Sequence, residues 1–355
     1  MATFMNPYST KRIYPPWFKR CVWSILCWRC RLTATFLQKL RPVTPSQNIV
    51  VLEPFGMGDV VALQPLVWVL CEEGKTVTAI CREAWLPIFR PHPNLRTVSL
   101  RQDFAYRKHF RQAVKAIRRC HDTMRPATGI DPRGDIRSVL ALWLSGICNR
   151  VETLECYFTA NDCPIPHGAA TAVHPVDRTV ERYKVSQVFA TLPLEPPTLG
   201  HLKQNAIATM QNGKTVGFIT NTPWEGKRWR KWAELEMALK TRGWTVKYIE
   251  CGSVGQWVAE LPQSDVIVSV NTGPMHLAAA LGIPLVVLEG SSRMPLWAPV
   301  SQRVTVIHHQ HEVACAPCHQ AGKCRRGHDC MERISVDETV EAVERMTVPL
   351  SRHST

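Results

Sequence analysis

The segment that most constrains the fold runs from residue 265 to residue 290, where the pattern predicts a strand, a tight turn, a helix and a second strand in direct succession. In the turn, Thr272 can cap a helix, Gly273 lets another group approach bare backbone, and Pro274 stands where a first-turn N–H is not needed. A helix that begins so close to the end of a parallel strand points unpaired N–H groups toward the edge where α/β proteins bind phosphates. An ordinary strand-turn-helix connection without a ligand would show the same local pattern.

Strand and helix patterns alternate in the same way through most of the chain. Residues 47–52 predict a first strand, which leads through Gly58 and Asp59 into a helix, and residues 215–220 predict a strand that opens a second series. A proline-rich stretch between residues 161 and 200, with a helical piece predicted from about residue 177 to residue 191, separates the two series. With 355 residues, of which 45% are hydrophobic, the chain is long enough for two α/β domains of ordinary size. The predicted fold class is α/β, with two Rossmann-like, doubly wound parallel-sheet domains.

The domain organisation predicted from these patterns has four parts. A basic extension of residues 1–46 precedes a first domain of residues 47–200, a second domain of residues 201–345 and a tail of residues 346–355. The extension contains no acidic residue, and its apolar side chains recur at roughly helical spacing, at Trp17, Phe18, Val22, Ile25, Leu32, Phe36 and Leu40. No apolar run in it approaches the roughly 20 residues that span a bilayer. We expect a basic amphipathic helix on an anionic membrane surface; a helix packed on the body of the protein and a disordered basic arm are the alternatives.

The net charge of the chain is +14, from 43 Lys and Arg residues against 29 Asp and Glu residues. Such a surplus indicates an anionic partner, and nucleic acid, an anionic membrane surface or a phosphorylated substrate each fit. The 14 cysteines are scattered without the framework of a small secreted domain, and no cleavable signal is apparent. We therefore expect a cytoplasmic protein whose cysteines are mostly free thiols or metal ligands.

Four of the cysteines, Cys315, Cys318, Cys324 and Cys330, lie in one stretch of 16 residues. Four thiolates are enough for a tetrahedral site, so the spacing predicts a metal loop at residues 315–330. Zn is expected first from the ligand type, and an iron bound by four cysteines competes with it because the ligand chemistry barely separates the two. A site with four protein ligands has no open position, so the expected role is structural. Free reduced thiols and disulfides are the alternatives.

Two cations follow the predicted strand at residues 215–220. Lys227 and Arg228 leave the carboxyl end of that strand, so they can face the same sheet edge as the helix that begins at Thr272. Two cations and a helix N-terminus together would clamp a pyrophosphate. A solvated charged loop would carry the same residues.

The first domain offers further polar residues at strand ends. Arg133 and Arg137 can receive an anionic substrate, and the alternative is that they form surface ion pairs with Asp131 and Asp135. The tight turn at Gly56 and Gly58 leaves Asp59 on the cleft side at the start of a helix, where an ordinary helix cap is the alternative.

Together these motifs resemble glycosyltransferase family 9, the family of the ADP-heptose:lipopolysaccharide heptosyltransferases, along most of residues 48–345. The resemblance rests on Gly58-Asp59, IDPRGDIRS at 130–138, Lys227-Arg228-Trp229, NTGPMHLAAALGIP at 271–284, and the cysteine segment that ends at Cys330. It implies the two-lobed GT-B fold, with an acceptor-binding N-terminal lobe, a nucleotide-sugar-binding C-terminal lobe and an active site in the central cleft that the two lobes face.

For this chain the resemblance implies an inverting transfer of a heptose-type sugar from ADP-heptose to a lipopolysaccharide core or related anionic acceptor, at the inner face of the bacterial inner membrane. Asp59 would be the general base that takes the proton of the acceptor hydroxyl. The implied donor contacts are Thr222, Lys227, Arg228, Asn271, Thr272, Gly273 and His276, and the implied acceptor contacts are Gly58, Arg133 and Arg137. Cations and backbone N–H groups would stabilise the leaving diphosphate, so no divalent metal is expected in catalysis. For His276, a buried capping histidine is the alternative.

The chain departs from the family pattern at two places. Asn271 stands where the family usually has Asp, and the segment 244–265 is shorter by roughly one strand-helix unit. Two alternatives therefore stay open: a heptosyltransferase that modifies a protein such as an adhesin, and a catalytically inactive scaffold that binds a sugar nucleotide or a lipid. A zinc-bearing nucleic-acid binder has no support in the motifs, so nucleic acid is not expected as a partner.

Overall fold

The chain forms two compact units. The structure, a computed structural model, describes residues 24–25, 28–29, 31–33, 35–37, 39–40, 46–101, 107–119, 127–146, 148–155, 170–205, 214–318, 324 and 327–346. The first unit comprises Met1–Phe55, Leu66–Asp177 and Ser186–Pro193, and the second comprises Gly56–Pro65, Arg178–Val185 and Leu194–Thr355. The second unit therefore takes two short segments from the range 47–200 that was predicted as the first domain.

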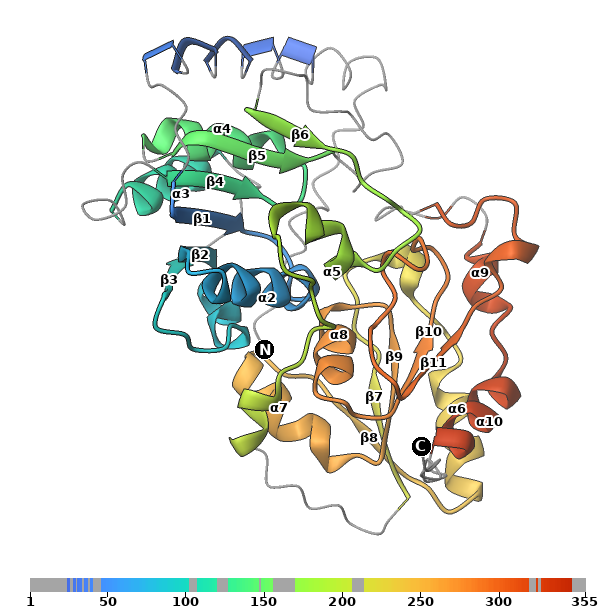
Figure 1. The fold of residues 1–355 in the computed structure, drawn as a ribbon. Helices are drawn as coiled ribbons and strands as arrows, with labels where there is room; N and C mark the ends of the chain where they lie inside the picture. The colour runs from blue at the N-terminus through green and yellow to red at the C-terminus, as the bar shows by residue number, and fades with distance from the viewer. Residues whose placement is uncertain are drawn as a thin grey trace. The chain divides into compact units, whose positions relative to one another are not determined.

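The described part of the first unit contains a parallel sheet with the strand order β3-β2-β1-β4-β5-β6 (Figure 1). The strands are β1 (Asn48–Glu53), β2 (Thr76–Arg82), β3 (Leu95–Leu100), β4 (Ala127–Asp131), β5 (Cys148–Leu154) and β6 (Ala172–His174). The helices along this part of the chain are α2 (Met57–Glu72), α3 (Arg107–Arg119) and α4 (Ile136–Ser145). The strand order changes direction between β1 and β4, which is the switch point of a doubly wound sheet.

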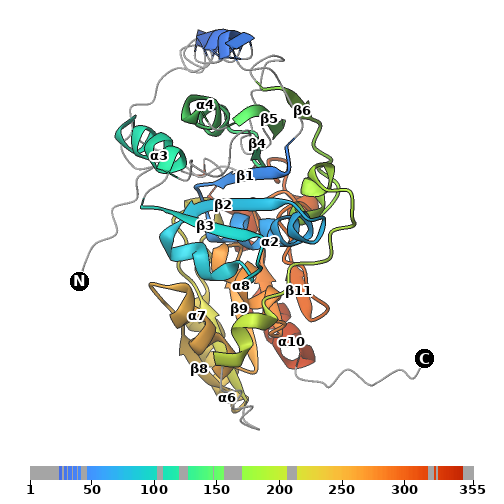
Figure 2. The same ribbon diagram turned by 60° about the vertical axis from the view of Figure 1, so that its left-hand side comes forward.

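Helix α4 shows how local sequence sets an element that covers this sheet. The side chain of Asp135 accepts a hydrogen bond from the backbone N–H of Arg137 at 2.8 Å, which caps the first turn. The helix ends at Gly146, whose φ of 81° is the left-handed conformation that glycine adopts without strain. Trp143 on this helix is completely buried in the core of the unit. Helix α3 lies beside α4 (Figure 2).

The second unit contains a parallel sheet with the strand order β11-β10-β9-β7-β8. The strands are β7 (Thr215–Ile219), β8 (Thr245–Tyr248), β9 (Val266–Val270), β10 (Leu285–Leu288) and β11 (Val304–Ile307). The helices are α5 (Arg182–Val185), α6 (Trp232–Thr241), α7 (Val254–Glu260), α8 (Gly273–Ala280), α9 (Asp329–Glu332) and α10 (Val336–Met346). The switch point of this sheet lies between β7 and β9, so ligands are expected beyond the carboxyl ends of these two strands.

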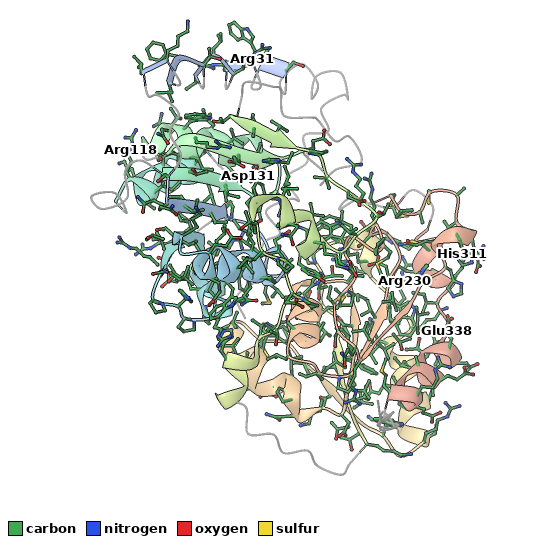
Figure 3. The ribbon with its side chains drawn as sticks, in the orientation of Figure 1. Arg31, Arg118, Asp131, Arg230, His311 and Glu338 are labelled. Atoms are coloured by element: carbon green, nitrogen blue, oxygen red, sulfur yellow. The ribbon has the colours of Figure 1, made fainter. Side chains whose placement is uncertain are left out.

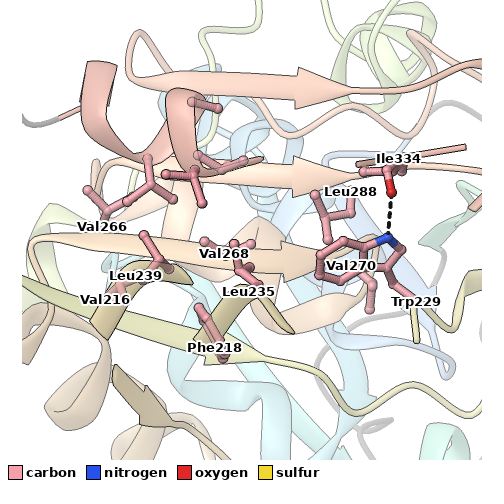
Figure 4. Close-up of a cluster of buried hydrophobic side chains, with 14 of the residues drawn as sticks. Val216, Phe218, Trp229, Leu235, Leu239, Val266, Val268, Val270, Leu288 and Ile334 are labelled. Carbon is pink, nitrogen blue, oxygen red and sulfur yellow. Dashed lines mark hydrogen bonds between the residues drawn. The ribbon is translucent and has the colours of Figure 1, made fainter. Parts of the chain in front are cut away.

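One face of the second sheet packs against α6 and α10, which lie side by side (Figure 1). Val266, Val268 and Val270 alternate along β9 and point into this core, where Figure 4 shows them with Phe218 and Leu235. The indole Nε1–H of the buried Trp229 donates to the carbonyl of Ile334 at 3.2 Å, which ties the loop after β7 to the C-terminal part of the chain (Figure 4).

Short 3₁₀ helices fill the connections. They are η1 (Glu83–Ile88), η2 (Ser186–Phe189), η3 (Gly200–Asn205), η4 (Glu225–Lys227), η5 (Leu261–Gln263) and η6 (Gln310–Glu312).

Between residues 24 and 40 the described pieces of the basic extension are helical. Its large apolar side chains are exposed, with 57% of Ile25, 61% of Trp28, 50% of Leu32, 62% of Phe36 and 61% of Leu40 accessible to solvent. Leu37 instead packs against the core of the first unit, and Arg31 lies on the same helical stretch (Figure 3). Among the helices that the structure describes, none is long and apolar enough to cross a bilayer.

Candidate active site

The switch point of the second unit brings together the residues that follow β7 and β9. Asn271, which follows β9 and is 4% exposed, accepts a hydrogen bond from Lys227 Nζ through Oδ1 at 3.3 Å. Its Nδ2 donates to the carbonyl of Trp297 at 2.9 Å. The Lys227 ammonium also lies 4.6 Å from the ring centre of Trp224. The structure thus joins two of the predicted donor-binding residues directly.

Thr272 occupies the N-cap position of α8, with extended backbone angles. Its side chain makes no capping hydrogen bond, and Oγ1 is buried without a hydrogen-bond partner among the described residues. A buried hydroxyl of this kind normally has a partner. At a helix N-terminus, where free N–H groups also point outward, the natural partner is an anion.

The start of α2 crosses the start of α8 within the second unit. A Cβ atom on Gly58 would lie 2.7 Å from Cδ2 of His276, and one on Gly273 would lie 3.0 Å from Cβ of Met57. Both positions therefore need glycine, because a side chain at either would force the two helix starts apart. This crossing places Asp59 in the same unit as the residues that follow β7 and β9.

Asp59 is 8% exposed and lies in the first turn of α2. Its carboxylate folds back over the helix start, since a Cβ on Gly56 would lie 2.9 Å from Asp59 Oδ2. This position suits a negative charge at a helix N-terminus, so the capping role and a role as base are compatible.

The charges around this crossing shift the pKa values of two basic residues. Burial lowers the pKa of Lys227, and the neighbouring carboxylates of Glu289 and Asp59 oppose that shift. Burial also lowers the pKa of His276 to about 4; Asp59 opposes this shift, whereas Lys227 and Arg182 add to it. His276 is therefore a neutral imidazole at neutral pH, able to donate or accept a hydrogen bond but not to act as a cation.

A cavity of ≈ 490 Å³ adjoins the same loops. Thr222 and Arg228 line it, together with Asn221 and Glu250, whose side chains are joined by a hydrogen bond of 2.7 Å. Thr222 is 4% exposed and accepts a hydrogen bond from the backbone N–H of Trp224 at 3.2 Å, which closes the turn after β7. The cavity is of the size that small ligands occupy.

The two predicted acceptor-binding arginines lie in the first unit. Arg133 and Arg137 flank Phe55, with guanidinium carbons 4.0 Å and 5.2 Å from the ring centre. Arg133 Nη1 lies 3.7 Å from a carboxylate oxygen of the buried Glu53, and Arg137 makes a two-point ion pair with Asp135, with its shorter contact at 2.6 Å. For Arg137 the structure thus contains the ion pair that is the alternative to anion binding.

Asp131 holds this loop in place (Figure 3). It is completely buried and accepts hydrogen bonds from the N–H of Asp135 at 2.7 Å, the N–H of Arg133 at 3.3 Å and Oγ1 of Thr153 at 2.7 Å. Burial nevertheless raises its pKa to about 7.

The other three cysteines of the segment lie near Cys330. Burial raises the pKa of the Cys330 thiol to about 11, and nearby Cys318, Cys315 and Cys324 add to this effect. The backbone N–H of His328 donates to Sγ of Cys324 at 3.4 Å. All cysteines in the described part of the chain are free thiols, and no three potential ligands there have the arrangement of a metal site. The four side chains are therefore neighbours without the arrangement of a metal centre.

Comparison with known proteins relates this unit to one family. The sequence model of glycosyltransferase family 9 (heptosyltransferase) matches residues 252–327, which contain the β9–α8 turn and β10. Lipooligosaccharide heptosyltransferase 2 of Campylobacter jejuni is 24% identical over 86 residues, which are 24% of this chain and 27% of that protein. The match thus spans about a quarter of the length of this relative.

Solved structures extend the likeness over both units. The ADP-heptose lipopolysaccharide heptosyltransferase II of E. coli matches with a TM-score of 0.61 and 17% identity, over 84% of this chain and 98% of that chain. By these matches the chain is similar to the heptosyltransferases of glycosyltransferase family 9. The predicted GT-B-type, Rossmann-like fold is confirmed. The iron-containing dodecameric glycosyltransferase TibC from enterotoxigenic E. coli also matches this heptosyltransferase-like chain, with a TM-score of 0.53 and 13% identity, over 84% of this chain and 76% of that chain.

Two buried charged residues of the heptosyltransferase-like chain were not predicted from the sequence. Glu289, with 0% exposure, affects the pKa of Lys227, and Arg182, with 2% exposure, affects that of His276. Glu289 directly follows a buried strand, the position that drew attention to Asn271, so the same rule could have found it. Arg182 lies in the proline-rich stretch, where no periodic pattern marks it.

Proposed function

We propose that the protein is an inverting glycosyltransferase that moves a heptose-type sugar from a nucleotide sugar, ADP-heptose, to a lipopolysaccharide core or related acceptor. The observation that carries this proposal is the convergence of Asp59, Lys227 and His276 at the N-terminus of α8, where Thr272 keeps an unpartnered buried hydroxyl. The likeness to an ADP-heptose lipopolysaccharide heptosyltransferase supports the choice of donor.

In this mechanism Asp59 is the general base. It accepts the proton of the acceptor hydroxyl while that oxygen attacks the anomeric carbon of the donor from the face opposite the leaving group, through an oxocarbenium-like transition state. The nucleoside diphosphate leaves with its electron pair and gains negative charge. Lys227, Arg228 and the N–H groups that follow Thr272 stabilise this charge, and no step requires a divalent metal. The neutral His276 contributes a hydrogen bond to phosphate or sugar.

Calorimetric titration with ADP, UDP and GDP, without added divalent metal, tests the donor assignment. We expect ADP to bind, and Lys227→Ala to weaken that binding by roughly 10- to 100-fold, because it removes a charge-assisted contact in a partly buried site. Lys240→Ala is the matched control, since Lys240 is an exposed lysine paired with Glu236 on α6 and should leave the affinity unchanged. If none of the nucleotides binds the wild type, the donor assignment fails and the inactive scaffold becomes the better account.

The acceptor is the open part of the proposal. Lipopolysaccharide core is the first choice because the family match is to heptosyltransferases of lipooligosaccharide and lipopolysaccharide. A protein such as an adhesin is the alternative. Transfer of labelled heptose to purified core lipid or to an unglycosylated adhesin, assayed side by side, separates the two.

We further propose that the N-terminal helix attaches the enzyme to the inner face of the bacterial inner membrane. Its exposed apolar residues and its basic residues suit the interface of an anionic bilayer. Co-sedimentation should be stronger with vesicles that contain phosphatidylglycerol than with phosphatidylcholine alone. The double variant Trp28→Ser/Phe36→Ser should lose it, whereas Met237→Ser, at an apolar residue 64% exposed on α6, should not. Equal sedimentation of the wild type, the double variant and Met237→Ser would contradict this proposal.

The cysteine segment is proposed to hold a structural metal, Zn or Fe, through Cys315, Cys318, Cys324 and Cys330. Four thiols that lie near one another, one of them buried, are a chemically suitable donor set, although their arrangement in this structure is not that of a metal centre. A metal held by these four thiols would tie the segment 315–330 together and would take no part in the transfer step. Because the similar structure of TibC contains iron, iron is proposed as an alternative to zinc.

A further inference from the structure

Glu289 stands beside Asn271 at the edge of the sheet where the donor is proposed to bind. In the parallel register of β9 and β10, Val270 pairs with Leu288. Asn271 directly follows β9, and Glu289 directly follows β10. The two residues therefore lie at adjacent strand ends. Glu289 is 0% exposed and Asn271 is 4% exposed.

The two oxygens of Glu289 have different surroundings. Oε1 accepts a hydrogen bond from the backbone N–H of Ser292 at 2.8 Å, and Oε2 is buried without a hydrogen-bond partner among the described residues. A buried carboxylate with an unpaired oxygen is costly unless a cation lies close by. Lys227 is a cation at this edge: it donates a hydrogen bond to Asn271, and the charge of Glu289 acts on its pKa.

Asn271 itself supplies no charge to Lys227. Its Oδ1 accepts from Lys227 and its Nδ2 donates to the carbonyl of Trp297, so both ends of the amide are used. An aspartate at this position would face that carbonyl with a second acceptor and would lose the contact. The amide therefore fits the position, and any negative charge that acts on Lys227 comes from other residues.

We propose that Glu289 is a positioning residue that supplies the counter-charge for Lys227 in place of Asn271, so that Lys227 meets the donor diphosphate as an ammonium ion. The inference rests on the proposed function and adds to it a residue that acts through Lys227. The other charged or titratable groups around Lys227 are Asp59, a second counter-charge, and His276, which is neutral and has Arg182 beside it.

The pH dependence follows from the direction of each influence. Burial lowers the pKa of Lys227, and Glu289 raises it again. Removing the charge of Glu289 should therefore lower this pKa further, so the lysine loses its proton at a lower pH. In such a variant the affinity for a diphosphate falls as pH rises through the lowered pKa, and it stays near that of the wild type below it.

The test is the affinity for ADP, measured by calorimetry between about pH 6 and about pH 9, a range in which a buried lysine can titrate. For Glu289→Gln we expect a loss of at least ~10-fold relative to the wild type at the alkaline end and a small loss at the acid end, since one pKa unit corresponds to tenfold. In a Lys227→Arg background the same change should alter affinity by less than about 2-fold at every pH, because a guanidinium stays charged. Glu260→Gln, at an exposed carboxylate on α7, is the control.

A structural role for Glu289 would give a different result. It would lower the affinity equally at every pH and by the same factor in the Lys227→Arg background, and this outcome would overturn the inference. The pKa of Lys227, measured without nucleotide from the pH dependence of its acylation rate by mass spectrometry, separates this inference from the donor assignment. An unchanged Lys227 pKa in Glu289→Gln would also overturn it, whether or not ADP binds.

Discussion

Asp59→Asn should lower kcat for heptose transfer by about 10²–10⁴-fold, the usual contribution of a general base. The amide keeps the size of the side chain and can still occupy the start of α2, but it cannot take the proton of the acceptor hydroxyl. Near pH 6, where Lys227 keeps its proton without this second counter-charge, the affinity for ADP should stay within about 3-fold of the wild type, since the phosphate contacts come from other residues. Kinetics with donor and acceptor, together with nucleotide calorimetry, check both halves of this prediction.

The nucleotide measurement also serves as the folding control for Asp59→Asn. A protein that binds ADP normally has an intact second unit, because Asp59, Lys227 and α8 all belong to it. Glu260→Gln should leave both kcat and the affinity unchanged. If Asp59→Asn kept full activity, Asp59 would be only the helix-start carboxylate that its position over Gly56 also suits.

Loss of the proposed metal should be the largest stability effect in the chain. We expect Cys318→Ser to reduce the metal content of the purified protein from about one equivalent to near zero and to lower Tm by roughly 5–10 °C, because binding energy at a structural site is folding energy. Cys318 is partly exposed, so the serine itself disturbs no core. Elemental analysis distinguishes zinc from iron, and calorimetric melting gives the stability.

Cys148→Ser is the control for the metal experiment. Cys148 is a completely buried thiol in the first unit, so its replacement can lower Tm through packing but should leave the metal content unchanged. Chelation of the wild type should reproduce the fall in Tm of Cys318→Ser and add nothing in that variant. If wild-type protein purified from metal-supplemented cells contained no bound metal, the cysteines would be free thiols and the metal proposal would be wrong.

Local patterns were enough to predict two parallel-sheet domains and the turn at Thr272, but not every strand. The strand, turn and helix between residues 265 and 281 correspond closely to β9 and α8, because alternation, a Thr-Gly-Pro start and an alanine-rich run are signals within a few residues. The proline-rich stretch was less predictable. Its pattern predicts a helical piece from about 177 to 191, whereas the structure has only α5 followed by η2.

The site was predictable where its residues lie just after the end of a strand, and less so where it depends on the register between strands. Lys227 and Asn271 could be expected to meet, because both come after strands at one switch point. The pairing of Val270 with Leu288, which puts Glu289 beside Asn271, is a contact between segments that no local pattern specifies. The sequence likewise could not decide whether Arg137 forms an ion pair or binds an anion, because both interpretations use the same residues.

The way the second unit is assembled from the chain bears on how such enzymes can be recombined. A chimera joined near residue 200 would inherit Lys227 and α8 from one parent but the segments Gly56–Pro65 and Arg178–Val185 from the other. Asp59 and Arg182 would then lie near an α8 from the other parent. Gly58 would contact the residue that the other parent has at the position of His276. An exchange that keeps these residues matched needs three transplanted pieces, because a single crossover near residue 200 would separate segments that pack in the same unit.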